Sequence, residues 1–119
     1  MKEITEVFAS AARTATPTSA KLTLASFAGV FVINVSAVTA TPSVVFTVKG
    51  VDPLTNTAYT ILASAAVTTT GTTVLRIHPA MTASANVIAA DILPESVEVT
   101  AVHGDADSIT YSVTFLGMS

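Results

Sequence analysis

The sequence predicts an all-β fold, an antiparallel β-sandwich of about seven or eight strands for which jelly-roll connections are one option. Five segments alternate apolar and polar residues with a period of two, as strands do when one face is buried, and a sixth is apolar on both faces. Most connections between these segments are too short for parallel crossovers. The narrow composition, dominated by Thr, Ala and Val, favours strands over long helices. Two stacked sheets would bury the apolar faces, and closure into a barrel is the alternative.

The N-terminal residues have a weaker strand pattern than the rest of the chain. Extended stretches at Ile4–Ala9 and Ser19–Ala25 are divided by the Thr-, Ala- and Pro-containing run Arg13–Thr18. Residues 1–20 are therefore predicted to form an N-terminal extended arm or an edge strand. Residues 21–119 are predicted to form a single β-sandwich domain, because 119 residues suffice for one core but not for two.

The strand pattern is clearest near the C-terminus, where Ile, Tyr, Val and Phe alternate with Thr and Ser over Ser108–Leu116. One of the other five segments, Gly29–Val38, is apolar on both faces, which predicts a strand packed on both sides or covered by a partner. The five further predicted strands are Gly29–Val38, Ser43–Val51, Thr57–Ala66, Gly71–His78 and Glu95–His103.

Turn-forming residues separate the predicted strands. Asp52–Asn56 has the chemistry of a type I turn, with Asp able to cap and Pro presetting φ, so a hairpin is predicted there. Gly104–Asp107 joins the last two strands, and Thr39–Pro42 separates two earlier ones. The stretch Pro79–Pro94 has no clear strand pattern, and Ala83–Ala90 within it is predicted to form one or two turns of helix.

Charge and hydropathy exclude several classes of function. The net charge is −3 and the five basic residues are scattered, so the electrostatic basis of nucleic-acid binding is missing. The most apolar run, Ala28–Val38, is far shorter than the roughly 20 residues of a membrane-spanning helix. Glu3 and Glu6 lie where a signal peptide would need a basic start and an apolar run, so synthesis in the cytoplasm is expected. With no cysteine, stability must come from burial or from partners.

The expected surface is poor in charge. A folded monomer of this mass should expose about 6,000 Å². Only five basic and eight acidic residues are available to cover it. Part of the surface is therefore predicted to be buried against other chains. The alternative is a monomer whose surface is made more polar by Thr and Ser hydroxyls.

Candidate catalytic and metal-binding residues are few. His78 and His103 each lie at a predicted strand end, where a base or a metal ligand could stand, but an exposed or hydrogen-bonded histidine is the favoured interpretation. Asp105 and Asp107 have a spacing seen in calcium loops, yet no glutamate follows at the right distance. They form a weak candidate metal pair whose favoured role is turn formation. The sequence predicts no catalytic or cofactor-binding residue, no cofactor and no enzyme.

Turn and strand landmarks follow one another along most of the chain: Gly29–Val38, Thr41–Gly50, Asp52–Pro53, Tyr59–Leu62, Gly71–Leu75, Leu93–Pro94 and Val102–Val113. Their order resembles a group of small proteins encoded among the head genes of tailed bacteriophages. The resemblance implies a virion structural protein, most directly a capsid decoration (cement) protein on the outer capsid surface. Its partners would be the major capsid protein and further copies of itself, a trimer being one form, with no nucleic acid and no membrane.

Two other classes share the predicted fold. A minor tail or connector protein would have the same composition but few copies in each particle. A carbohydrate-binding module would need an aromatic platform, and the chain has no Trp. In the decoration hypothesis, residues before the first strong strand reach across to neighbouring subunits, and repeated interfaces offset the entropy lost on ordering them.

Overall fold

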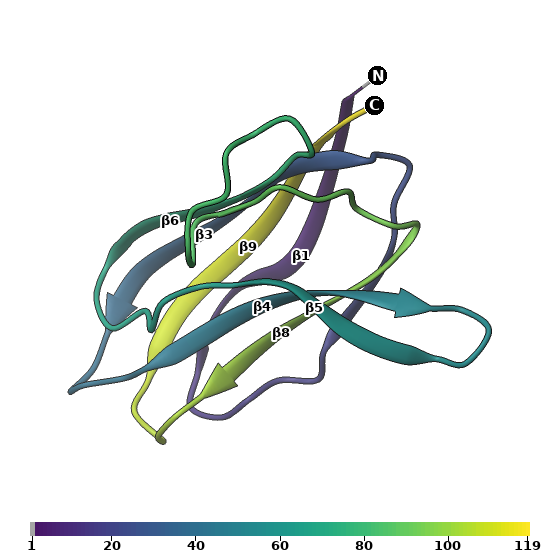
Figure 1. Cartoon of the computed structure of the whole chain (residues 1–119). Coiled ribbons are helices and arrows are strands. Elements are labelled where there is room, and N and C mark those ends of the chain that lie inside the picture. The colour runs from purple at the N-terminus through teal and green to yellow at the C-terminus, as the bar shows by residue number, and fades with distance from the viewer. Residues whose placement is uncertain (1) are drawn as a thin grey trace.

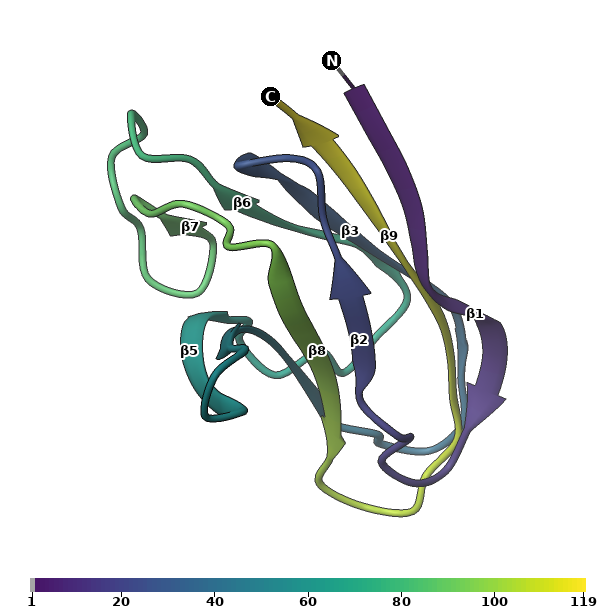
Figure 2. The same ribbon diagram turned by 90° about the vertical axis from the view of Figure 1, so that its right-hand side faces the viewer.

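Nine strands in two packed sheets make up the computed structural model, which describes residues 2–119 (Figures 1 and 2). Sheet A has the strand order β1-β9-β3-β6-β7, and sheet B has the order β2-β8-β4-β5. The predicted β-sandwich is confirmed. Within residues 2–119 there is no helix, and so none that could cross a membrane. The strands are β1 (Lys2–Arg13), β2 (Ala20–Thr23), β3 (Ala28–Val38), β4 (Val44–Asp52), β5 (Thr57–Ala63), β6 (Gly71–Ile77), β7 (Ile88–Ala89), β8 (Ser96–His103) and β9 (Ile109–Met118).

The pairing of the eight longer strands is nested, which is the jelly-roll arrangement. β4 pairs with β5, β3 with β6, β2 with β8 and β1 with β9, all antiparallel. The chain thus folds as one long antiparallel hairpin whose successive strand pairs alternate between the two sheets. Further antiparallel pairing of β3 with β9 and of β4 with β8 completes the sheets. The two-residue β7 is the exception, because it adds to the edge of β6 in parallel.

Aromatic side chains from both sheets meet in the core. Phe31 of β3 and Phe115 of β9 have ring centroids 4.8 Å apart. Phe46 of β4, from the other sheet, meets Tyr111 of β9 edge to face at 5.0 Å. All four rings are almost completely buried, and each such pair stabilises the fold by about 0.5–1.5 kcal/mol beyond the burial of its area. The large apolar residues of the period-two pattern therefore point into the core, as predicted.

The predicted helical turns at Ala83–Ala90 are wrong. Asn86 has a positive φ of 64°, which breaks helical geometry inside the segment. The backbone then pairs with β6: Arg76 N–H donates to the Val87 carbonyl at 2.9 Å, and His78 N–H donates to the Ala89 carbonyl at 3.1 Å. Backbone hydrogen bonds to β6 thus take the place of hydrogen bonds within a helix, and because of this pairing the segment forms the short strand β7.

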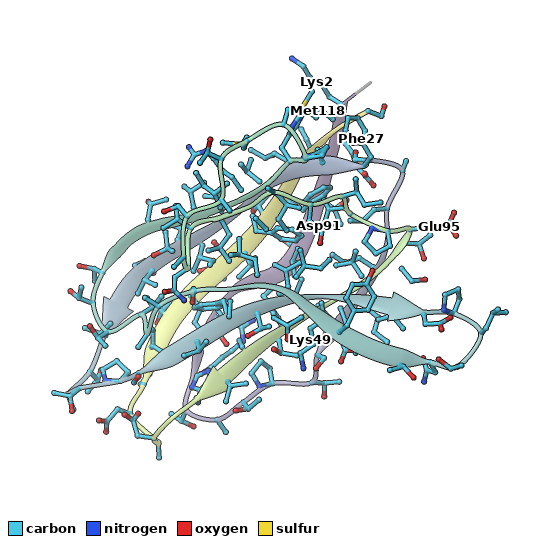
Figure 3. All side chains as sticks on the ribbon, viewed as in Figure 1. Lys2, Phe27, Lys49, Asp91, Glu95 and Met118 are labelled. Carbon is cyan, nitrogen blue, oxygen red and sulfur yellow. The ribbon has the colours of Figure 1, made fainter. Side chains whose placement is uncertain are left out.

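The N-terminal segment is an edge strand of its own chain. β1 pairs with β9 along its length and forms one margin of sheet A (Figure 2). It begins beside the C-terminal end of the chain, where Lys2 lies opposite Met118 (Figure 3). β2 forms an edge of sheet B, paired with β8. Each sheet thus begins with a strand that precedes the first strongly patterned segment.

Candidate interaction surface on the outer face of sheet A

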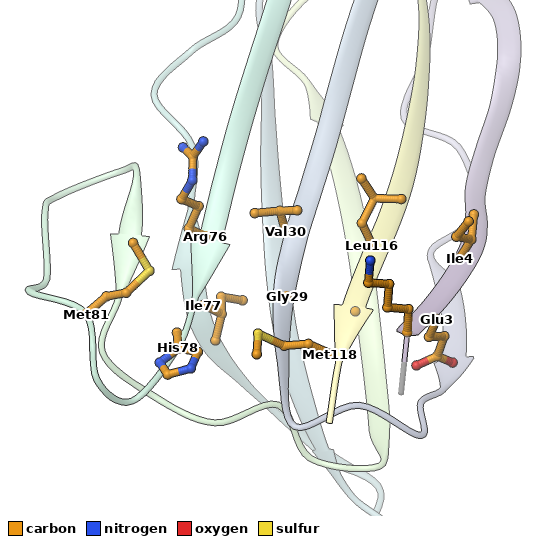
Figure 4. A pocket seen from close by; sticks show the side chains of 12 residues that line it. Glu3, Ile4, Gly29, Val30, Arg76, Ile77, His78, Met81, Leu116 and Met118 are labelled. Carbon is orange, nitrogen blue, oxygen red and sulfur yellow. The ribbon is translucent and has the colours of Figure 1, made fainter.

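The outer face of sheet A carries a row of side chains that crosses four strands. The alternation that buries Phe31 and Phe115 turns their neighbours in β3 and β9 outward. The register then places Ile4 of β1 beside Leu116, Leu116 beside Val30 of β3, and Val30 beside Arg76 of β6. Figure 4 shows this order of side chains across the sheet. The row is apolar in its middle and ends in a cation.

A groove of about 460 Å³ runs over this row and is lined almost entirely by apolar atoms. Ile4 is 79% exposed and Leu116 is 41% exposed, although both are large aliphatic side chains. Met81, from the loop after β6, closes one side. We call this feature the outer groove and define it by Ile4, Val30, Arg76, Met81, Leu116 and Met118.

The central strands under the outer groove contain no charged residue. Neither β3 nor β9 has an Asp, Glu, Lys or Arg anywhere in its length. The central strands of sheet B differ, because β4 contains Lys49 and β8 contains Glu98, paired opposite one another. Lys21 of β2 lies on the other side of Glu98. Of the two sheets, sheet A therefore presents the outer face whose centre can be desolvated without burying a charge.

Two facing glycines form part of the floor beneath the outer groove. Gly29 of β3 lies opposite Gly117 of β9. A Cβ at Gly29 would lie 2.5 Å from the Leu116 carbonyl oxygen and 2.7 Å from the Phe115 ring. The core ring therefore lies directly against the strand backbone at this point. No periodicity in the sequence indicates this close approach, since it depends on the register between strands that are far apart along the chain.

The two histidines lie at different sites. His78 follows β6 at the edge of the outer groove, and its Nδ1 accepts a hydrogen bond from Ala80 N–H at 2.9 Å. His103 ends β8, and its Nε2 lies 3.0 Å from the Tyr111 hydroxyl. Tyr111 lies near the beginning of β9, whereas the outer groove crosses the end of that strand. The structure thus does not bring the histidines together, and each has a local hydrogen-bond partner, the interpretation that the sequence favours.

His103, Tyr111 and Arg13 form a cluster in which the histidine and the arginine both contact the tyrosine. The Arg13 guanidinium lies 4.5 Å from the centroid of the Tyr111 ring. It donates hydrogen bonds to the carbonyls of Ala9 at 2.7 Å and of Tyr111 at 3.0 Å. These bonds fall where the β1–β9 register shifts, so the guanidinium satisfies carbonyls at a β-bulge. Sequence reasoning missed this role, because the bulge is a property of pairing between the two ends of the chain.

Burial changes the titration of this cluster. The pKa of His103 lies below its usual 6.5, mainly because burial disfavours the charged ring and secondly because Arg13 is near, while Asp105 opposes both effects. Burial also raises the pKa of Tyr111 above 10.0, against the opposing effect of Arg13. His103 Nδ1 is buried without a hydrogen-bond partner, so a second ring proton would have no acceptor. The cluster is suited to holding a neutral imidazole against the core.

Asp105 and Asp107 act in the turn before β9. Asp107 accepts a hydrogen bond from Thr41 N–H at 3.2 Å, which ties this turn to the loop between β3 and β4. Asp105 accepts from the backbone N–H of Asp107 at 3.1 Å. Within residues 2–119, no group of three or more His, Cys, Asp or Glu side chains is placed to hold a metal ion. The hydrogen bonds of this pair are those of turn residues.

Comparison of the chain with protein-family models, with curated proteins and with solved structures found no match.

Proposed function

We propose that this chain is a bacteriophage virion structural protein, a capsid decoration (cement) protein that binds the outer surface of the capsid lattice through the outer groove. The observation that carries the proposal is the apolar groove over two central strands that contain no charged residue. Two further features support it: the order of landmarks in the sequence, and a jelly-roll topology, which recurs in viral capsid proteins and also in lectins.

Attachment through this face is energetically reasonable. Fully burying an exposed Leu, Ile or Met side chain stabilises a complex by about 1.5–3 kcal/mol, and Ile4, Leu116 and Met118 are all partly or largely exposed. No charge on β3 or β9 has to be desolvated in exchange.

Exposed aromatic residues do not form a sugar platform. Tyr59 of β5 lies against Gly50 of β4, on sheet B. Phe27, just before β3, lies against His78, with ring centroids 5.8 Å apart. Because these two aromatics belong to different sheets, no observation favours the carbohydrate-binding alternative over the proposed function.

Quantitative mass spectrometry of purified particles tests the proposal. The number of copies of this chain would be compared with the number of copies of the major capsid protein. We expect a ratio near one, or a simple fraction such as one-half or one-third, as regular lattice sites require. A few copies in each particle would instead assign the chain to the portal or tail, and complete absence from particles would overturn the structural role.

A further inference from the structure

We propose that β1 is a self-association edge, and that two copies of the chain pair through antiparallel β1 strands centred on Ile4. β1 is the terminal strand of sheet A and pairs on one side only, with β9 (Figure 2). Among residues 2–119, no hydrogen bond between two backbone groups involves residues 2–13 outside the β1–β9 ladder. Such an edge presents free N–H and C=O groups to any strand that can align with it.

Only the first part of β1 is suited to pairing. Lys2–Glu6 keeps an unbroken register with β9, from Lys2 opposite Met118 to Glu6 opposite Thr114. Beyond Glu6 the register shifts twice, and the Arg13 guanidinium occupies the carbonyls of Ala9 and Ala11. Bulges of this kind twist an edge away from a second strand. The regular stretch is thus residues 2–6, and its centre is Ile4.

The charges of this stretch are complementary to themselves. Lys2, Ile4 and Glu6 alternate along β1 on the outer face of sheet A, and all three are exposed. In an antiparallel pair centred on Ile4, Lys2 lies opposite Glu6 of the second copy, and this happens twice because the pair has two-fold symmetry. Ile4 then lies opposite Ile4 of the second copy, which covers a side chain that is 79% exposed in the single chain.

The alternative registers are worse. Moving the second strand by two residues in either direction keeps the same faces outward but places Ile4 opposite a charged residue, either Lys2 or Glu6. In the register centred on Ile4, therefore, each charged side chain faces one of the opposite sign, and the apolar Ile4 faces the Ile4 of the second copy. Glu3 faces the other way, where its carboxylate accepts a hydrogen bond from the Ser26 hydroxyl at 2.8 Å, so it is already satisfied within its own chain.

Pairing would also join the two outer grooves. Ile4 is the β1 end of the row that continues through Leu116 and Val30. In the paired form the two rows meet at Ile4 and form one apolar strip across a continuous sheet that contains sheet A of both copies. This inference does not rest on the proposed function. It specifies a two-fold pair at this edge, whereas a trimer is one form of the homo-oligomer expected from the sequence.

Charge exchange tests the pairing. Self-association of the purified full chain would be measured by sedimentation equilibrium up to millimolar concentration, for the native chain and for Lys2→Glu, Glu6→Lys and the double variant. Each single variant places like charges opposite one another twice, and we expect association to weaken by about tenfold or more. The double variant restores both pairs and should associate within about threefold of the native chain. Lys21→Glu on β2, the edge of the other sheet, is the matched control and should associate like the native chain.

A cysteine reporter tests the register, because the chain contains no cysteine of its own. Directly opposed residues of antiparallel strands have Cα atoms about 4.5–5.5 Å apart, within the range that a disulfide spans. Ile4→Cys should therefore form a disulfide-linked dimer on mild oxidation, and Ser10→Cys in the bulged part of β1 should not. A native chain that stays monomeric at millimolar concentration would overturn the proposal, because β1 would then not pair with a second copy. Single variants that associate like the native chain, or equal cross-linking at positions 4 and 10, would also overturn it.

Discussion

At the residue scale, one backbone oxygen decides which residue can occupy position 29. A Cβ there would lie 2.5 Å from the Leu116 carbonyl oxygen, an atom of a central strand that cannot move alone. A Cβ at Gly50 would instead meet the ring of Tyr59, which is half exposed and free to rotate away. The two glycines look alike in the sequence, but their neighbours differ.

We therefore predict that Gly29→Ala lowers the free energy of unfolding by about 1–3 kcal/mol, the usual range for overpacking. Gly50→Ala should lose less than about 1 kcal/mol, because alanine also removes some of the conformational freedom that glycine has in the unfolded chain. Urea denaturation of both variants measures the difference. Equal losses would show that the Leu116 carbonyl does not restrict position 29.

His103 makes stability depend on pH. Its pKa lies below 6.5 in the folded protein, because burial disfavours the charged ring. Its buried Nδ1 has no hydrogen-bond partner, so an N–H of the charged ring at this atom would have no acceptor. The unfolded chain therefore binds more protons than the folded protein just below pH 6.5. His103 therefore contributes its full stabilisation above pH 6.5, and this contribution to the free energy of unfolding decreases as the pH falls from 6.5 toward the lowered pKa of the ring.

The predicted result is a free energy of unfolding that decreases between pH 7 and pH 5, with a smaller decrease in His103→Gln. Glutamine can still hydrogen-bond the Tyr111 hydroxyl but does not titrate. Denaturation series at several pH values for both proteins provide the comparison. An identical decrease in the variant would assign the pH dependence to groups other than His103. Asp52 is not one of them, because its pKa is lowered from 3.8 and its titration therefore lies outside this pH range.

At the element scale, the strands with a clear period of two could be predicted from the sequence. The expected strands Ser43–Val51, Glu95–His103 and Ser108–Leu116 correspond to β4, β8 and β9 within about two residues at each end. The predicted hairpin turn after β4 is also present: Asn56 N–H donates to the Asp52 carbonyl at 2.7 Å, and Asp52 Oδ1 accepts from Leu54 N–H at 2.9 Å. In these elements, local side-chain chemistry is enough to determine the structure.

Elements that depend on a distant partner could not be predicted in this way. β7 is two residues long and exists because the N–H groups of Arg76 and His78 donate hydrogen bonds to the carbonyls of Val87, just before β7, and of Ala89 within it. β1 has a weak pattern because its bulges interrupt the alternation, and the Arg13 guanidinium replaces the missing ladder bonds. A sequence pattern reports which face of a segment is buried, but not which backbone groups of another segment lie beside it.

The outer groove was only partly predictable for the same reason. The sequence shows that Gly29–Val38 is apolar on both faces, and the structure shows that the outward residue Val30 lies in the groove. What the sequence could not show is that Ile4 and Leu116, from the two ends of the chain, lie in the same row. That neighbourhood results from the nested pairing of β1 with β9.

At the scale of the whole molecule, the two outer faces differ in what they can bind. The sheet B face has Lys49 and Glu98 at its centre, whereas the sheet A face has an apolar row at its centre and keeps its charges on the flanking strands β1 and β6. The jelly roll closes the core of a single chain without disulfides. The sheet A face can therefore serve for attachment without being needed to complete the fold.

Attachment through the sheet A face is tested by the binding of purified chain to particles that lack it, measured for two matched variants. Leu116→Glu places a charge in the outer groove, and Val102→Glu places the same charge on the outer face of sheet B, at a side chain that is likewise about half exposed. We predict at least a tenfold loss of affinity for Leu116→Glu and native affinity for Val102→Glu, with both variants folded. Native affinity for Leu116→Glu, or an equal loss in both variants, would contradict attachment through sheet A.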